Sequence, residues 1–353
     1  MQDSGSDSDV RAPRTLVVGA GAVGSVLAAS LWRAGVPVEV LTKPAHAAEA
    51  AARDGFSVGG VGFDARFTAR PTVTAEARHL RRPQCVFLAT KAIHVVDALQ
   101  EIGPKLGTQS TVVVMQNGYC EEEVAEIVGP ERVVSCTVRW GATLTSPTHS
   151  VRTSAGGFTI GRLRREGDGV DETLLTVAGL LETCAPVRVT PNVLGARYAK
   201  LVLNACMTTL GAVTGLRLRD ILGRPAGREM FIRTATEGVR VFRALGVRLE
   251  HVDGLDLRWL CVEPGSKWPE MRRARAEFAL RVLRLMRGGI LSSSLQSLQR
   301  GELTEIDYLN GYIVRKAREV GLEAPVNALL VERVREIERG AREIGPHNLG
   351  LRR

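Results

Sequence analysis

The feature that most constrains this chain is a glycine-rich turn close to its N-terminus. Leu16-Val17-Val18 leads into Gly19-Ala20-Gly21-Ala22-Val23-Gly24, and a helical stretch follows from Ser25 to Arg33. The pattern G-x-G-x-x-G is weak by itself, but between a strand and a helix it predicts a dinucleotide-binding unit. The alternative is a glycine-rich turn that only shapes the backbone.

Each glycine of this turn has its own physical task. Gly19 permits the tight turn, Gly21 lets the backbone approach a pyrophosphate, and Gly24 lets the helix pack closely on the strand. The start of the following helix supplies N–H donors and partial positive charge for the phosphates. We therefore expect the cofactor to be bound by Gly19, Gly21, Ala22, Val23 and Gly24.

The first half of the chain alternates short β-branched runs with helical segments, which predicts a parallel sheet covered by helices on both faces. After Pro191 strand-like runs nearly vanish and helical periodicity dominates. The expected fold class is α/β, with a Rossmann-type N-terminal dinucleotide-binding domain followed by an all-α C-terminal domain. The expected strands are 15–18, 38–41, 85–89, 111–115, 133–138 and 187–190, and the later helices are 195–213, 228–245, 270–287 and 303–320.

A length of 353 residues is sufficient for two domains. We expect an NADP-binding Rossmann-like domain over 14–190 and a helical substrate and catalytic domain over 191–340. Residues 1–13 are acidic and polar and are expected to form a disordered leader, and residues 341–353 a fraying tail. Residues 153–161 are expected to form turns and exposed, antiparallel strands.

The composition limits the classes of partner. The net charge is +9, but Arg and Glu interleave, which is typical of solvated helix faces rather than a nucleic-acid surface. Aromatic residues are only 5%, and the six cysteines form no C-x-x-C pair. The longest apolar stretch, Leu201–Leu216, is too short and polar to span a bilayer. We expect a cytoplasmic protein without nucleic-acid, membrane or metal partners, and a homodimer is left open.

The end of the second strand bears on the choice of cofactor. An NAD site usually has an acidic residue there, which binds the ribose hydroxyls. In this chain Val38-Glu39-Val40-Leu41 is followed by Thr42 and Lys43. A hydroxyl and a cation suit a 2′-phosphate, so we expect NADPH to be bound by Thr42 and Lys43. The alternative is that Lys43 is a solvated loop residue.

Several segments, in their order and spacing, give the chain a family resemblance. The chain resembles ketopantoate reductases over residues 15–338. That resemblance implies a nucleotide-binding domain and a helical domain with the active site in the cleft between them. The segments that carry it are the glycine turn, Leu88-Ala89-Thr90-Lys91-Ala92, Met115-Gln116-Asn117-Gly118, Lys200-Leu201-Val202-Leu203-Asn204, Ser292-Ser293-Ser294-Leu295-Gln296 and Thr304-Glu305-Ile306-Asp307.

The resemblance also implies roles for particular residues. Lys91 helps to hold the cofactor, and the amide of Asn117 serves both cofactor and substrate. Lys200 is the general acid that protonates the developing alkoxide, and Asn204, one helical turn away, binds a substrate oxygen. From the residues alone, Lys91 could be a surface lysine, Asn117 a helix cap and Lys200 a snorkelling side chain.

Three further residues follow from the same resemblance. Glu305 lies in the active site and orients substrate and lysine, Ser293 contacts the substrate carboxylate, and Thr208 stands where a second substrate-binding Asn is common. From physics alone, Glu305 could instead favour the helix dipole and Ser293 could be a helix cap. We expected Glu305 to open the helix that reaches Val320.

The chain also departs from the family pattern, which affects the substrate. Ser297 replaces a usual Asp, Glu302 lies where a basic residue is common, and the segment 259–269 has no counterpart in the pattern. The expected reaction is the NADPH-dependent reduction of a small 2-oxo acid, foremost 2-dehydropantoate to (R)-pantoate. The alternatives are another oxo acid in specialised metabolism, or a non-catalytic NADP-binding sensor.

Overall fold

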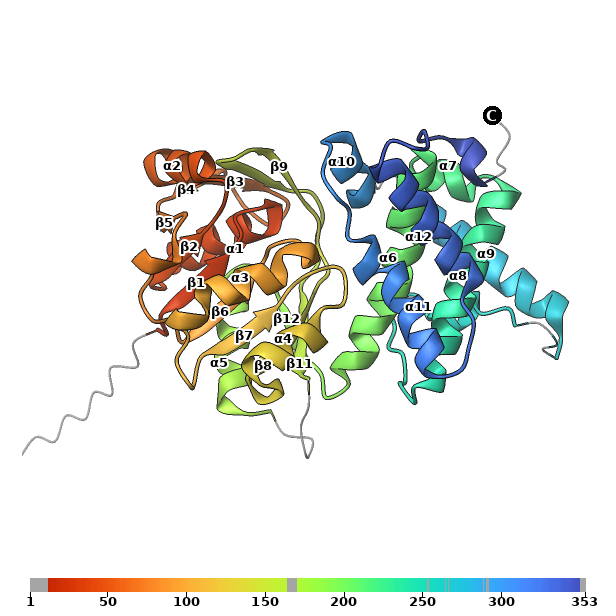
Figure 1. Cartoon of the computed structure of the whole chain (residues 1–353), viewed down its shortest axis with the longest axis horizontal. Helices are drawn as coiled ribbons and strands as arrows, with labels where there is room; N and C mark the ends of the chain where they lie inside the picture. The colour runs from red at the N-terminus through yellow and green to blue at the C-terminus, as the bar shows by residue number, and fades with distance from the viewer. Residues whose placement is uncertain are drawn as a thin grey trace, which may run out of the picture.

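The structure is a computed structural model that describes residues 12–163, 170–252, 254–263, 265, 267–287, 289 and 292–349. A half built on β-sheets lies beside a half built from helices, with the change at residues 190–192 (Figure 1). The expected leader up to residue 11 and the end of the expected tail from residue 350 lie outside the described residues.

An eight-stranded sheet forms the frame of the first half. Its order is β12-β11-β8-β7-β6-β1-β2-β5, and all neighbouring strands are parallel except β8 and β11. Short runs of β-branched residues form these strands because their side chains pack well on both covered faces of a sheet. The strands are β1 (Thr15–Val18), β2 (Val38–Leu41), β5 (Thr72–Thr74), β6 (Cys85–Leu88), β7 (Thr111–Val114), β8 (Val133–Val138), β11 (Phe158–Arg162) and β12 (Val187–Val189).

Helices cover both faces of this sheet. Val17 packs in one core with residues of α1 (Ala22–Arg33) and α5 (Glu172–Glu182). Leu16 and Val18 point to the opposite face and pack with α3 (Val95–Ile102) and α4 (Glu121–Val128). α2 (Ala45–Asp54) contacts β5. This alternation along one strand is the pattern expected for a sheet buried on both sides.

A second, four-stranded sheet packs against α1. Its order is β4-β3-β10-β9, with β3 (Phe56–Gly60), β4 (Phe67–Ala69), β9 (Ala142–Ser146) and β10 (His149–Arg152). The segment 153–161 differs from our expectation, because its strand β11 is antiparallel to β8 but lies buried in the large sheet. Phe158 and Ile160 fill the core there, so the strand is not exposed.

The helical half is arranged around α6 (Val193–Thr214). This helix has 22 residues, or about 33 Å at 1.5 Å per residue, and contacts α8, α10 and α12. The side chain of Asn192 caps its start, and Gly215, with a φ of +72°, ends it in the left-handed region. The other helices are α7 (Leu218–Leu222), α8 (Pro225–Ala244), α9 (Pro269–Arg287), α10 (Ser293–Gln299), α11 (Asn310–Glu319) and α12 (Pro325–Glu338).

The expected helix over 303–320 is wrong in its first part. Residues 306–308 form a 3₁₀ turn, Leu309 leaves the helical region with φ −105° and ψ −100°, and α11 begins only at Asn310. Glu305 therefore precedes a short turn and does not open a long helix, because the break at Leu309 turns the chain.

The described part of the expected tail is packed on the helical half. Residues 346–349 form a 3₁₀ turn, Asn348 donates a hydrogen bond to the carbonyl of Val213, and Leu349 is buried. An apolar residue and a capping amide therefore hold this segment against the end of α6. Among the described helices, none combines the length and apolar composition needed to cross a membrane.

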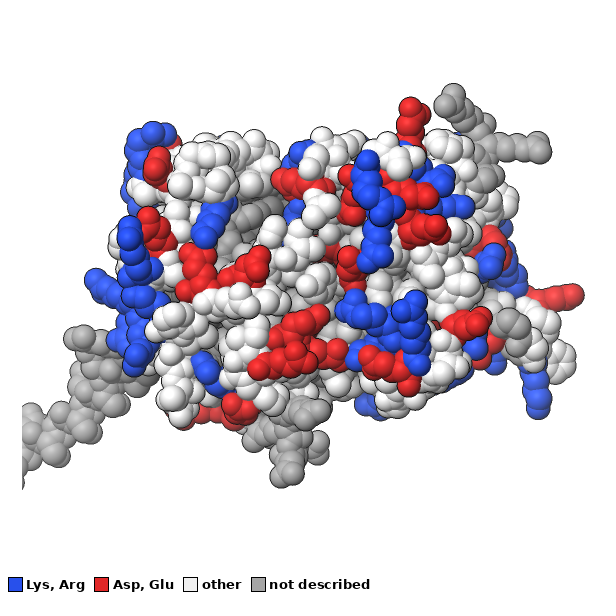
Figure 2. Space-filling view, viewed as in Figure 1, with Lys and Arg blue, Asp and Glu red and all other residues white. Residues whose placement is uncertain are grey.

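Figure 2 shows the same face with its charges. Basic and acidic side chains are intermixed on it, so the net charge of +9 is not gathered there into one basic surface.

Candidate active site

The ends of four parallel strands lie at one edge of the large sheet. β1, β2, β6 and β7 are adjacent and in parallel register, and the residues after them are Gly19, Thr42, Lys91 and Asn117. The carboxyl edge of an open parallel sheet is where such folds bind ligands. α6, α10 and the turn after Glu305 face this edge from the helical half, as the hydrogen bonds below show.

The glycine turn is shaped for a close ligand. Gly19 has a φ of +98°, and a Cβ on it would lie 2.8 Å from the backbone nitrogen of Thr90. A Cβ on Gly24 would lie 1.9 Å from the carbonyl oxygen of Gly19, whereas a Cβ on Gly21 would meet nothing within 4 Å. Gly19 and Gly24 are therefore required by the fold itself, and the open space over Gly21 fits a dinucleotide pyrophosphate.

The start of α1 completes this cradle. The helix begins at Ala22 and Val23, both half-buried, and Gly21 at its N-cap is exposed. No side chain caps this helix end. Its first N–H groups are therefore of the kind that bind an anion.

Thr42 and Lys43 occupy different environments. Thr42 is buried, and its hydroxyl accepts a hydrogen bond from the N–H of Ala20 at 3.3 Å. Through this hydrogen bond Thr42 stabilises the glycine turn. Lys43 is exposed, and its Nζ lies 2.6 Å from a carboxylate oxygen of Glu101. A cation therefore lies beside the end of β2, paired with an acid from α3.

Lys200 and Asn117 meet across the two halves. The Nζ of Lys200 donates to the side-chain oxygen of Asn117 at 3.1 Å and to the carbonyl oxygen of Val138. Asn117 is exposed, and Lys200 is half-buried. An ammonium held this way lies at the carboxyl edge of the sheet, where a substrate can reach it.

The remaining predicted substrate residues follow along α6 and α10. Asn204 is half-buried one turn after Lys200, and its carbonyl accepts the hydroxyl of Thr208. The hydroxyl of Ser292 donates to the carbonyl of Thr208 and caps α10 by accepting from the N–H of Leu295. Ser293 is the first residue of α10 and is exposed. The capping serine is thus Ser292, which leaves the hydroxyl of Ser293 outside the cap.

Glu305 reaches across to the sheet half. One of its carboxylate oxygens accepts a hydrogen bond from the N–H of Ala92 at 2.8 Å. Burial raises the pKa of this carboxyl, although the Ala92 N–H and the charges of Lys91 and Lys200 oppose the shift. The side chain therefore bonds across to the sheet half, where the charges of both lysines act on it, and a helix-dipole role does not require this contact.

Lys91 is bonded to two residues at which the chain departs from the family pattern. Its Nζ lies 2.9 Å from the hydroxyl of Ser297 and 2.5 Å from a carboxylate oxygen of Glu302, and it also donates to the carbonyl of Leu303 at 3.4 Å. The sequence singled out both positions but gave no sign that they share a partner.

A buried ion pair supports the site and was missed from the sequence. The Nε of Arg197 lies 2.5 Å from Glu121, and the same guanidinium donates to the carbonyls of Gln116 and Gly118 on either side of Asn117. Both charged side chains are almost fully buried. Burial lowers the pKa of Arg197, but the charge of Glu121 and its hydrogen bond act together against burial, and that pKa stays above its ordinary value. The available signal was a lone Arg in an apolar helical stretch, three residues before Lys200.

Together these groups form a site with the parts of a dinucleotide-dependent reductase. An anion cradle lies at the start of α1, and an ammonium and an amide lie at the same sheet edge. Among the described residues, no group of three or more His, Cys, Asp or Glu side chains could hold a metal ion.

Comparisons with known proteins agree with this arrangement. Two family models match, "Ketopantoate reductase PanE/ApbA" over residues 15–165 and "Ketopantoate reductase PanE/ApbA C terminal" over 192–338. A curated 2-dehydropantoate 2-reductase of Pyrococcus horikoshii is 27% identical over 318 residues, covering 89% of this chain and 94% of the relative.

Solved structures share the fold at low sequence identity. A ketopantoate reductase of the same family from Ralstonia eutropha superposes with a TM-score of 0.76 at 24% identity, covering 93% of this chain and all of the other. D-mandelate dehydrogenase, solved with NADH and anilino(oxo)acetate, has a TM-score of 0.78 at 22% identity, covering 93% and 99%. Because the two models together match most of its length, the chain belongs to the ketopantoate reductase family of oxidoreductases.

Proposed function

We propose that this protein reduces a small 2-oxo acid to a 2-hydroxy acid with NADPH, and that its substrate is 2-dehydropantoate, giving (R)-pantoate. The observation that carries the proposal is the contact between Lys200 of α6 and Asn117 at the sheet edge. It supports a proton donor at the place where a nicotinamide fold presents its substrate. The names of the curated relatives support the same substrate.

In this mechanism each half of the chain has its own task. Residues 14–190 bind the cofactor, which supplies the hydride, and residues 191–340 bind the substrate. The N–H groups at the start of α1 hold the pyrophosphate over Gly21, and Lys91 adds a positive charge. Asn117 orients both ligands.

Lys200 protonates the oxygen as the carbonyl is reduced, because its ammonium can release a proton as negative charge develops. Glu305 favours the charged form of that lysine and fixes its position. Ser293 binds the carboxylate of the substrate, and Asn204 and Thr208 hydrogen-bond its remaining oxygens. These roles are consistent with the exposure of Ser293 and with the half-buried positions of Asn204 and Thr208.

We infer the preference for NADPH from Lys43. Its ammonium lies beside the end of β2, and its pairing with Glu101 can be exchanged for a 2′-phosphate. The test is kcat/KM with NADPH and NADH in the wild type and in Lys43→Ala. A charged hydrogen bond is worth about 1.5–3 kcal/mol, so the variant should lose roughly 10- to 150-fold with NADPH alone. Equal values for both cofactors in the wild type would contradict this preference.

A different oxo acid is the second candidate substrate, and Ser297 and Glu302 favour it. Both accept hydrogen bonds from Lys91, and we infer that the tail of a substrate passes beside them. A panel of 2-oxo acids that includes 2-dehydropantoate, followed by the absorbance of NADPH, separates the two candidates. Turnover of no member, with NADPH still bound, would support the non-catalytic sensor instead.

We propose that a second copy of this chain covers α9. The helix exposes an apolar stripe made by Met271, Phe278, Val282 and Leu285, and Trp268, exposed as well, directly precedes the helix. In an antiparallel pair of α9 helices, Phe278 of one copy would lie against Phe278 of the other. Met271 of each copy would lie against Leu285 of the other, because both residues are seven positions from Phe278. A two-fold interface requires such self-complementary contacts. Light scattering should give a dimer for the wild type and a monomer for Phe278→Glu. A monomeric wild type, or binding of the stripe to lipid vesicles only, would contradict the proposal.

A further inference from the structure

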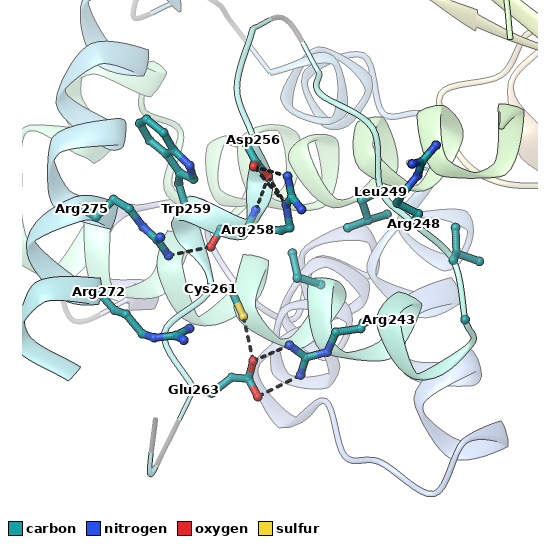
Figure 3. A pocket seen from close by; sticks show the side chains of 13 residues that line it. Arg243, Arg248, Leu249, Asp256, Arg258, Trp259, Cys261, Glu263, Arg272 and Arg275 are labelled. Atoms are coloured by element: carbon teal, nitrogen blue, oxygen red, sulfur yellow. Dashed lines mark hydrogen bonds and ion pairs between the residues drawn. The ribbon is translucent and has the colours of Figure 1, made fainter. Parts of the chain in front are cut away.

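A cavity of about 640 Å³ lies in the helical half and contains none of the active-site residues described above. The C-terminal part of α8, the segment 246–263 and the first turns of α9 enclose it (Figure 3). Three residues of its wall, Trp259, Cys261 and Glu263, belong to the segment 259–269, for which the sequence suggested no counterpart in the family pattern.

The wall of this cavity is strongly basic. It carries five guanidinium groups and two carboxylates, and two of the guanidiniums are neutralised. Arg243 donates two hydrogen bonds to Glu263 at 2.9 and 3.0 Å, and Arg258 binds Asp256 at 2.7 Å (Figure 3). Each of these two ion pairs is therefore electrically neutral. The five guanidiniums belong to Arg243, Arg248, Arg258, Arg272 and Arg275.

The other three arginines have no carboxylate partner among the described residues. Arg272 donates to the carbonyl of Lys267, and Arg275 to the carbonyl of Arg258. The Nε of Arg275 is buried and has no hydrogen-bond partner within the described part of the chain. A buried donor without a partner usually marks the place of a missing water or ion. Arg248 is exposed and lines the cavity on the side opposite Arg272 and Arg275, with its guanidinium turned away from them in Figure 3.

The rest of the lining is apolar or uncharged. Val239, Val247 and Leu249 contribute aliphatic surface, and Trp259 is 43% exposed. Burial, together with Glu263, raises the pKa of Cys261 to about 12, so this residue stays a neutral thiol. The cavity thus combines three arginines that have no carboxylate partner within the described part of the chain with an exposed aromatic residue.

We propose that this cavity binds a small phosphate ester with an aromatic body, such as a nucleoside diphosphate. Guanidinium groups match the geometry and charge of phosphate oxygens, and the indole of Trp259 offers a surface on which a base can stack. A volume of this size falls within the range of small-molecule sites, about 300–1,000 Å³. The site is separate from the cofactor cradle at α1, and the inference does not depend on the proposed reaction.

The test is calorimetric titration with ADP, pyrophosphate and inorganic phosphate, with NADPH saturating the cofactor site. The wild type should bind one ADP, and Arg272→Ala, Arg275→Ala and Arg248→Ala should each weaken binding by about tenfold or more. Arg281→Ala is the matched control, because Arg281 is exposed on the same helix and does not line the cavity. Trp259→Ala should weaken ADP but leave pyrophosphate unchanged.

Three outcomes would overturn the proposal. No binding of any of the three compounds to the wild type would show that the cavity is not an anion site. An equal loss in Arg281→Ala would show a general charge effect. Equal affinity for ADP in the wild type and Trp259→Ala would remove the aromatic part and leave a simple phosphate site. Arg248→Ala keeps the test decisive if an α9 variant fails to fold, since Arg248 lies in an exposed loop.

Discussion

At the scale of single residues, the site depends on contacts between side chains that are far apart in the sequence. Lys200 and Asn117 are separated by 83 positions and lie 3.1 Å apart. Each residue could be proposed from its motif, but their contact could not, because it depends on how the halves dock. The structure also separates two serines that the sequence treats alike, since Ser292 caps α10 and Ser293 is exposed.

Replacing Lys200 by Ala should abolish most turnover and leave cofactor binding intact. General acid catalysis is worth about 10²–10⁴-fold, so kcat should fall by that order. Stopped-flow kinetics and NADPH titration measure the two properties separately. Lys105→Ala is the control, since that lysine donates to the carbonyl of Arg78 in the sheet half, away from the candidate site. A variant that keeps most of its activity would make Lys200 a structural side chain.

Replacing Glu305 by Gln should reduce kcat by about tenfold or more without loss of stability. Gln still accepts the N–H of Ala92 but carries no charge beside the two lysines. Burial raises the pKa of Glu305 above its ordinary 4.5, so the fold favours the protonated form. The stabilisation that comes from this raised pKa is therefore fully present below pH 4.5. It is lost as the pH rises through the raised pKa of Glu305.

The melting temperature of Glu305→Gln should accordingly equal or exceed that of the wild type at pH 7, and the advantage should shrink at pH 4. Thermal melts at both values test the sign of this shift. A variant with normal kcat and a lower melting temperature at pH 7 would make Glu305 a structural residue only.

At the scale of elements, the sequence predicted the parts whose pattern is local. Strands 15–18, 38–41 and 133–138 agree with the structure to the residue, because β-branched runs between turns mark both ends. The prediction of a helix over 303–320 was wrong at its start. The backbone leaves the helical region at Leu309 because of how the segment packs, and the local sequence pattern does not mark this break. The interleaved charges at 332–336 indicated a solvated helix face, but the bounds 325–338 were not predicted, although Pro325 at the first position marks the start.

The turn between β1 and α1 gives a matched pair of glycine variants. Gly21→Ala should fold normally, because its Cβ would meet nothing within 4 Å, but it should weaken NADPH binding by narrowing the approach of the pyrophosphate. Gly24→Ala should lower stability, because its Cβ would lie 1.9 Å from the carbonyl oxygen of Gly19. Thermal melts and cofactor titration compare the two. Unchanged NADPH affinity in Gly21→Ala would place the pyrophosphate elsewhere.

The pair between Arg197 and Glu121 fastens α6 to α4 and to the loop that carries Asn117. Arg197→Met should destabilise the fold by about 3–5 kcal/mol, because it leaves the buried carboxylate of Glu121 without its partner. The double variant Arg197→Met, Glu121→Gln should recover a large part of that loss. Urea unfolding measures both, and equal stability of the single and double variants would show that the two charges are not coupled.

At the scale of the whole molecule, the two halves are joined by polar contacts at the candidate site. Lys91 bonds to Ser297 and Glu302, and Ala92 bonds to Glu305, all of them more than 200 positions away. The sequence marked Ser297 and Glu302 as departures from a pattern and read them as substrate residues. The sequence could not show that both residues bind Lys91. Hydrophobic periodicity reports the elements within each half, but it does not report how the two halves pack against each other.

The contacts of Lys91 with Ser297, Glu302 and Leu303 form a polar bridge between the two halves. If Lys91 holds the cofactor, then Glu302 competes with the cofactor for its ammonium. Glu302→Gln removes that competing charge, so NADPH should bind more tightly, by about two- to fivefold, since an exposed ion pair contributes roughly 0.2–1 kcal/mol. The gain should diminish at high salt, because Glu302 is exposed and its charge is screened. Glu323→Gln is the control, as that exposed acid follows α11 and lies outside the bridge. Unchanged NADPH affinity in Glu302→Gln at low salt would contradict this prediction. It would mean that Lys91 keeps its contacts to the helical half while the cofactor is bound. The lysine would then join the two halves and would not bind the cofactor.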